Sequence, residues 1–138
     1  MPKATSADKL QRMVQVALND AKARDITVLD MQNISDFTDY MVIATGTSNR
    51  HVQSTADNVV EALRHHGRRT VGIEGKKNGD WVLIDFGDVV VHVMREEIRD
   101  FYNLEKLWSD ARRVRSPTSR QSAGEVSSTG KSKMAKQR

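Results

Sequence analysis

Two apolar runs in the C-terminal half of the chain are separated by only two residues. WVLIDF (81–86) and VVVHVM (89–94) are each long enough for a strand, and the Gly87-Asp88 connection between them is typical of a tight hairpin. The sequence therefore predicts an antiparallel pair of strands. TVGIE (70–74) precedes this pair and, through a turn-rich connection, adds a third strand to the same meander.

Two helices and two further strands are predicted in the N-terminal half. Apolar residues recur at helical spacing over residues 6–24 and again over 49–66. Between these helices, the β-branched run at 25–31 predicts a strand, and the continuous apolar run at 40–45 predicts a central strand covered on both faces. A last helix is expected over 95–108, where the first turn is acidic.

The predicted order of elements is α-β-β-α-β-β-β-α, without internal repeats. Because the strands from 70 to 94 are expected to be antiparallel, the order indicates an α+β fold rather than a doubly wound one. We expect a mixed five-stranded sheet flanked by helices.

The charged residues are distributed unevenly along the chain. Residues 112–138 hold eight of the 22 lysines and arginines but only one of the 18 acidic residues, which leaves residues 1–111 with a net charge of −3. The C-terminal segment also has few large apolar residues, so it cannot bury enough surface to offset the entropy of ordering it. We predict one folded domain over 1–111 and a disordered basic tail over 112–138.

Cysteines and long apolar runs are both missing from the sequence. Without cysteine, disulfides, thiolate metal sites and cysteine nucleophiles are excluded. No apolar run approaches the roughly 18 residues that a membrane-spanning helix needs. The N-terminus also lacks the apolar stretch of a secretory signal, so we expect a soluble protein of the cytosol.

The loop ATGTSNRH (44–51) has the small residues and hydroxyls with which many phosphate sites begin. It nevertheless contains neither the P-loop motif nor the glycine motif of dinucleotide-binding folds. Thr45, Thr47 and Ser48 are explained as hydroxyls that cap the first turn of the following helix. An anion or partner held by free backbone amides is the alternative.

We predict no catalytic residue, cofactor site or metal site. Asp36 and Asp39 lie close together in a loop, where acids usually face water or cap turns, and a metal role is the alternative. His51 and His66 lie about 22 Å apart along one helix, at 1.5 Å per residue, and so cannot share a metal within the chain.

Trp81 is the most suggestive candidate for a contact with a partner. It opens a strand next to Asp80 and shares a strand face with Leu83 and Asp85, so its ring lies between acidic residues. A tryptophan in this setting is either an interface anchor or rim packing at the end of a strand. His92 lies in the next strand, either as a hydrogen-bonded residue of the sheet face or as a functional residue.

Three separate segments together resemble one known family. They are SDFTDYMVIATGTSNRH (35–51), EG (74–75) followed by DWVLIDFGDVVVHVM (80–94), and REEIRDFYNLEKLW (95–108). In this order they resemble the ribosomal silencing factor family, also called the RsfS or Iojap family. The resemblance covers about residues 8–110, which is nearly the whole predicted domain.

The resemblance implies a translational repressor that is not an enzyme. Such a protein is expected to bind the large ribosomal subunit through ribosomal protein number fourteen. It blocks association with the small subunit and lowers translation in stationary phase or when nutrients are scarce. The resemblance also implies a nucleotidyltransferase-like fold and a capacity to form homodimers. No organelle targeting signal is evident in the sequence, so we expect a bacterial cytoplasmic location rather than a mitochondrion or plastid. The acidic pair that nucleotidyltransferases use for metal is absent, because TGTS is followed by NRH.

We expect the contact with the large subunit to centre on Trp81. Asp80, Asp85 and Glu74 are expected to pair with basic groups of the partner, and His92 to lie on the same surface. An acidic domain is suited to a basic ribosomal protein and is repelled by rRNA. The basic tail either contacts rRNA or another polyanion, or only keeps the protein in solution and has no specific partner.

Other functions remain open from the sequence. The protein could act in maturation of the large subunit rather than in silencing. A nucleotidyltransferase-like enzyme would instead use Asp36 or Asp39 to bind magnesium and a nucleotide. General RNA binding through the tail is a third class, and deletion of residues 115–138 would separate it from the first.

Overall fold

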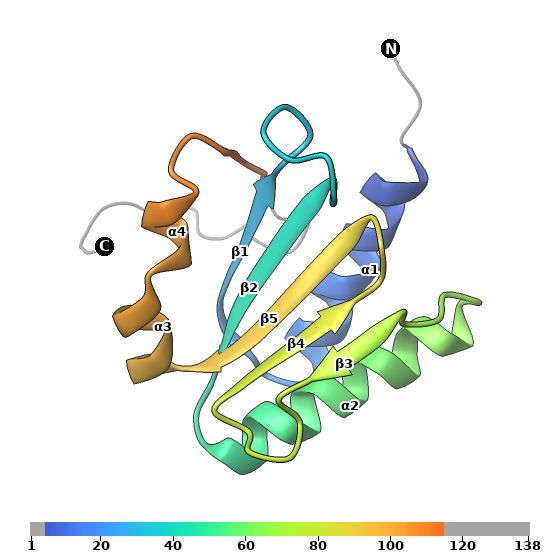
Figure 1. The fold of residues 1–138 in the computed structure, drawn as a ribbon. Coiled ribbons are helices and arrows are strands. Elements are labelled where there is room, and N and C mark those ends of the chain that lie inside the picture. The colour runs from blue at the N-terminus through green and yellow to red at the C-terminus, as the bar shows by residue number, and fades with distance from the viewer. Residues whose placement is uncertain (1–4, 115–138) are drawn as a thin grey trace, which may run out of the picture.

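The computed structural model describes residues 5–114, and within this range six strands form one mixed sheet. The strands are β1 (Arg24–Asp30), β2 (Tyr40–Gly46), β3 (Gly72–Glu74), β4 (Trp81–Asp85), β5 (Val89–Arg95) and β6 (Arg112–Arg113). Their order across the sheet is β3-β4-β5-β2-β1-β6 (Figure 1). The α+β prediction is confirmed, and the likeness to nucleotidyltransferases stays a prediction.

The centre of the sheet is the parallel pair formed by β2 and β5. Their register runs from Tyr40 opposite Val89 to Gly46 opposite Arg95, and every other neighbouring pair of strands is antiparallel. Every residue of β2 is buried, as expected for a strand covered on both faces. The hairpin between β4 and β5 is also confirmed, with Gly87 at a φ of 87° in its turn.

Two long helices, α1 (Ser6–Asp20) and α2 (Asn49–His65), cover one face of the sheet (Figure 1). Their apolar stripes pack on the side chains that β1, β2, β4 and β5 direct to this face, and together these residues form the larger hydrophobic core. Leu18, Val59 and Leu63 are completely buried in it. Both helices begin close to the residues that the helical periodicity predicted.

The opposite face carries two short helices, α3 (Glu96–Tyr102) and α4 (Leu104–Leu107). The single helix predicted over 95–108 was wrong, because Asn103 breaks it with a left-handed φ of 46°. Asparagine tolerates this conformation, and its side chain then accepts a hydrogen bond from the amide of Lys106 and caps α4. A smaller core with Leu29, Ile43 and Met94 lies beneath the two helices.

The sixth strand was not predicted. Arg112 and Arg113 of β6 pair with Asp30 and Leu29 at the edge of β1, and the Arg112 guanidinium lies 2.9 Å from the Asp30 carboxylate. The predicted five-stranded sheet is therefore extended by one short strand, which lies past the predicted domain boundary at 111. The predicted tail from 115 to 138 lies outside the described residues. Within residues 5–114, no helix is both long and apolar enough to cross a membrane.

Gly46 stands where β2 passes into α2. A Cβ at this position would lie 2.6 Å from Cγ2 of Val52 and 3.1 Å from its Cα, so the first turn of α2 approaches the strand closely because residue 46 has no side chain. The glycine of the ATGTS loop is thus explained by packing. Gly72 differs from Gly46, because a Cβ at residue 72 would have no heavy atom within 4 Å.

We predict that Gly46→Ala lowers the free energy of unfolding by about 1–3 kcal/mol, because the extra methyl group overpacks the junction of β2 and α2. Gly72→Ala is the control and should change stability by less than about 0.5 kcal/mol. Urea unfolding followed by circular dichroism measures both variants. Equal stability of the two variants would contradict this packing explanation.

Candidate partner-binding surface

Most of the sequence-predicted site residues lie on the sheet face that carries α3 and α4. Glu74, Leu83 and His92 are paired in one row across β3, β4 and β5. Trp81 and Asp85 flank Leu83 on the same side of β4, while Val82 and Ile84 point into the larger core. Trp81, Leu83 and Asp85 are each partly exposed, so α3 and α4 leave this end of the sheet accessible.

The indole ring of Trp81 is fixed from two sides. Its Nε1 donates a hydrogen bond of 2.9 Å to Nδ1 of His92. The ring of Tyr102, from α3, lies against it with the two ring centroids 4.9 Å apart. Trp81 is therefore a half-buried aromatic residue held in one orientation, as an interface anchor needs to be.

His92 supports Trp81 from inside the sheet face. Only 5% of the residue is exposed, and burial lowers the pKa of the imidazole to about 4, so the ring is neutral at pH 7. Because Nδ1 accepts the indole proton, the imidazole carries its own proton on Nε2, for which residues 5–114 supply no acceptor. The structure agrees with the hydrogen-bonded alternative for His92.

Asp80 is already engaged inside the fold. Its carboxylate accepts hydrogen bonds from the side chain of Asn49 at 2.8 Å and from Nε of Arg95 at 3.0 Å. A third donor is the side-chain amide of Asn78 at 3.2 Å. Asp80 therefore joins the start of α2 to the end of β5, and its pairing with a partner stays a prediction.

The other two predicted acids differ in their surroundings. Asp85 uses Oδ1 to accept the amide of Gly87 at 2.7 Å, which stabilises the hairpin turn and leaves the second carboxylate oxygen available. Glu74 is exposed on β3 and, with Trp81 and Leu83, lines a shallow hollow of about 290 Å³. Their contact with a partner remains a prediction.

Two aromatic residues of α3 extend this region, and the sequence analysis did not select them. Phe101 is 79% exposed and Tyr102 is 52% exposed, although both lie in the apolar pattern of the predicted last helix. Their rings meet edge to face, with centroids 5.0 Å apart. We call Trp81, Leu83, Phe101 and Tyr102 together the aromatic surface. Arg99, rather than either aromatic residue, is the buried residue of α3.

Two backbone amides at the junction of the ATGTS loop with α2 are already bonded within the fold. Oγ of Ser48 accepts the amide of His51 at 3.0 Å, which confirms the predicted cap for this residue. The amide of Thr47 donates to Nδ1 of His51 at 2.9 Å. Thr45 does not act as a cap, because its hydroxyl accepts a hydrogen bond from Arg99 instead.

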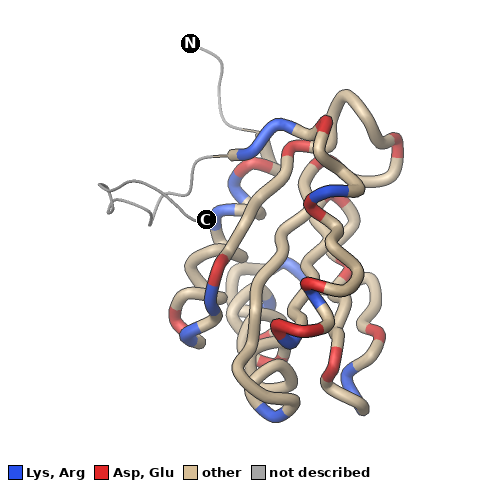
Figure 2. The backbone as a smooth tube through the Cα atoms, turned by 90° about the vertical axis from the view of Figure 1, so that its left-hand side faces the viewer, with Lys and Arg blue, Asp and Glu red and all other residues tan. Residues whose placement is uncertain are grey.

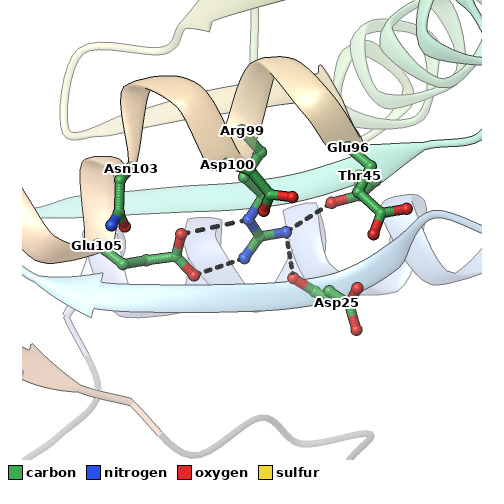
Figure 3. Close-up of a pocket in the computed structure, with 7 residues that line it drawn as sticks. All are labelled: Asp25, Thr45, Glu96, Arg99, Asp100, Asn103 and Glu105. Carbon is green, nitrogen blue, oxygen red and sulfur yellow. Dashed lines mark hydrogen bonds and ion pairs between the residues drawn. The ribbon is translucent and has the colours of Figure 1, made fainter. Parts of the chain in front are cut away.

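A larger pocket of about 430 Å³ lies beneath α3 (Figure 3). Its lining is polar and contains four carboxylates and one guanidinium: Asp25, Thr45, Glu96, Arg99, Asp100, Asn103 and Glu105. An excess of negative charge disfavours a polyphosphate ligand here. In the part of the chain that the structure describes, no group of three or more His, Asp or Glu side chains is placed to hold a metal ion.

We predict that the burial of His92 makes the protein less stable in mild acid. The unfolded chain takes up a proton near the ordinary pKa of 6.5, whereas folded His92 takes it up only near 4. The contribution of neutral His92 to the free energy of unfolding is therefore complete above about pH 6.5. It decreases by up to about 3 kcal/mol as the pH falls to 4. His92→Gln should remove this part of the pH dependence in urea unfolding. His66→Gln, at an exposed histidine, is the control, and an unchanged dependence in His92→Gln would contradict the assignment.

Comparison with known proteins identifies the family. The sequence matches the family described as "Ribosomal silencing factor during starvation" over residues 4–138. It is 43% identical over 100 residues to "Ribosomal silencing factor RsfS" of Chromobacterium violaceum, an alignment that covers 72% of this chain and 82% of the relative. It is also 41% identical over 100 residues to "Mitochondrial assembly of ribosomal large subunit protein 1" of Mus musculus, covering 70% of this chain and 44% of that protein.

A solved structure gives the same result for the fold. A crystal structure of a protein from Chromobacterium violaceum superposes with a TM-score of 0.74 and 41% sequence identity, over 76% of this chain and 88% of that chain. The sequence matches and the shared fold agree with the resemblance seen in the three sequence segments. The chain belongs to the ribosomal silencing factor family.

Proposed function

We propose that this protein is a nonenzymatic translational repressor that binds the large ribosomal subunit and sterically blocks its association with the small subunit. In this proposal the direct partner is ribosomal protein number fourteen, and the block lowers translation when nutrients are limiting. The family match supports ribosome-associated silencing, because the family is described by that role. The partner-binding site is proposed from the geometry of this chain.

The observation that carries the proposal is the aromatic surface. Exposed aromatic residues that are rigid before binding supply contact area at a low cost in side-chain entropy, and such residues dominate the energetics of many interfaces. Trp81 is held by His92 and Tyr102, and Phe101 continues the surface onto α3. An aromatic group exposed to this degree is otherwise unfavourable for a soluble domain.

The charges beside the aromatic surface favour a basic partner. Glu74 and Asp85 lie at its β3–β4 side, and α3 contributes Glu96, Glu97 and Asp100, whereas the arginine of that helix is buried. Figure 2, which views the molecule from the side of α3 and α4, shows acidic and basic positions interspersed along the chain. The complementarity is therefore local to the surface, as expected for recognition of one basic protein rather than of rRNA in general.

A role in maturation of the large subunit is the second candidate function. It is supported by the name of the mouse relative, "Mitochondrial assembly of ribosomal large subunit protein 1". Both functions require the large subunit as partner, so the same aromatic surface serves either one. They differ in the state of the subunit that is bound: silencing acts on mature subunits, whereas maturation acts on precursors.

We predict that Trp81→Ala weakens binding to purified large subunits by at least about thirtyfold, because truncation of a central aromatic anchor typically costs 2 kcal/mol or more. Cosedimentation over a range of protein concentrations measures the affinity. Phe37→Ala is the matched control, because Phe37 is 93% exposed but lies on the loop between β1 and β2. Undiminished binding by folded Trp81→Ala would contradict the proposed surface.

We also predict that deletion of residues 115–138 leaves binding to the large subunit intact at physiological salt. The surface proposed here lies entirely within residues 74–102, whereas the deleted segment carries six basic residues and one acidic residue. Removal of those charges should reduce only the salt-dependent, nonspecific part of binding to free RNA. Loss of cosedimentation with the large subunit upon this deletion would instead favour a general RNA binder that acts through its tail.

A further inference from the structure

Helices α3 and α4 are attached to the sheet by little apolar burial. Among the described residues, Arg99 is the one buried residue of α3, with 8% of it exposed, and α4 has no buried residue. Ile98, Leu104 and Trp108 are only partly buried in the smaller core, and the aromatic rings of α3 face solvent. A charged side chain therefore occupies the place where a surface helix usually directs its apolar residues.

Arg99 uses all five of its N–H donors within the fold. Figure 3 shows the bonds to Glu105, Thr45 and Asp25. Nε and Nη2 form a bidentate pair with the Glu105 carboxylate, at 3.3 and 2.7 Å. Nη1 donates to the hydroxyl of Thr45 at 2.8 Å and to the carbonyl of Asp25 at 2.7 Å. Nη2 also donates to the hydroxyl of Thr27 at 3.1 Å, so one guanidinium connects α3 with α4, β1 and β2.

The sheet is irregular at the point where it receives this side chain. The register between β1 and β2 shifts between Arg24 and Thr27, and Asp25 is not among the paired positions. Asp25 has a positive φ of 51°, which is uncommon for a residue other than glycine. Its carbonyl, outside the ladder, accepts a hydrogen bond from Arg99 instead.

Glu105 is held ionised by the same contact. Burial raises the pKa of the Glu105 carboxyl, but the hydrogen bonds and charge of Arg99, together with the charge of Arg113 and the hydroxyl of Thr27, outweigh burial and lower it. A bidentate pair with a carboxylate, shared with two hydroxyls and a carbonyl, needs the planar fork of arginine. A lysine here would keep the charge but, with three donors, would leave at least two of these five acceptors without a donor.

We propose that Arg99 is the positioning residue of the aromatic surface. It fixes α3 on β1 and β2, and thereby holds Tyr102, three residues later on the same helix, against Trp81. The effect of Arg99 on binding to a partner rests on the proposed function. The orientation of Trp81 itself is a property of the free protein and is tested without a partner.

The first test reads the Trp81 indole N–H resonance in the free, ¹⁵N-labelled protein, with the signal assigned through Trp81→Phe. Arg99→Lys should shift this resonance in the same direction as Tyr102→Ala does, because both remove the tyrosine ring from the indole. Arg64→Lys is the matched control, at an exposed arginine paired with Glu61, and should leave the resonance in place. An unmoved Trp81 signal in folded Arg99→Lys would overturn the inference.

The second test is a double-mutant cycle on affinity for purified large subunits. Arg99→Lys should weaken binding roughly tenfold in the wild-type background but less than about twofold in a Tyr102→Ala background, because its effect passes through Tyr102. An equal loss in both backgrounds, or no loss in either, contradicts a positioning role. Arg64→Lys should bind as the wild type does.

Two further outcomes are also decisive. If Arg99→Lys does not fold, Glu105→Gln takes its place in both tests, because it keeps one oxygen acceptor but removes the charge and one hydrogen bond of the bidentate pair. If the wild-type protein does not bind large subunits, the proposed function fails. The indole resonance of the free protein then still decides whether Arg99 positions Trp81.

Discussion

The parallel pairing of β2 with β5 is the constraint on which the rest of the structure depends. It places two apolar strands at the centre of the sheet and requires α2 to cross over one face between them. That face is closed by α1 and α2, which leaves only the short C-terminal helices for the other face. The incomplete cover is the reason that Trp81 and Leu83 remain accessible on a well-packed sheet.

The two faces are stabilised by different physical interactions. One is an ordinary apolar interface between helices and sheet, in which burial of Leu18 and Leu63 contributes directly to stability. On the other face, hydrogen bonds from Arg99 hold α3 on the sheet. Phe101 and Tyr102 can therefore stay exposed, because their rings are not needed to hold α3 in place. Because Arg99 holds α3 in place, the aromatic surface stays available for a partner.

Local sequence patterns predicted most of the fold and part of the candidate site. The hairpin around Gly87 and the buried strand at 40–45 were predictable because apolar runs and turn residues act over short distances. The strand at Arg112 and the engagement of Asp80 were not, because each depends on contacts with residues far away in the sequence. The break at Asn103 is local, but the helical periodicity of residues 95–108 continues through it and hides it. The sequence singled out Trp81 as a candidate contact and left rim packing as the alternative, and its role in binding stays a prediction. Its hydrogen bond to His92 depends on the register of β4 and β5 and could not be predicted from local pattern.

The central claim is that one protein surface excludes the small subunit from the large one. The most direct measurement mixes purified, mature large and small subunits under conditions that favour joining, adds increasing amounts of this protein, and separates the particles on a sucrose gradient. We expect the fraction of joined ribosomes to decrease as protein is added. The decrease should saturate near one protein per large subunit, with the protein found in the large-subunit fraction. Joined ribosomes that persist while the protein occupies the large subunit would contradict it.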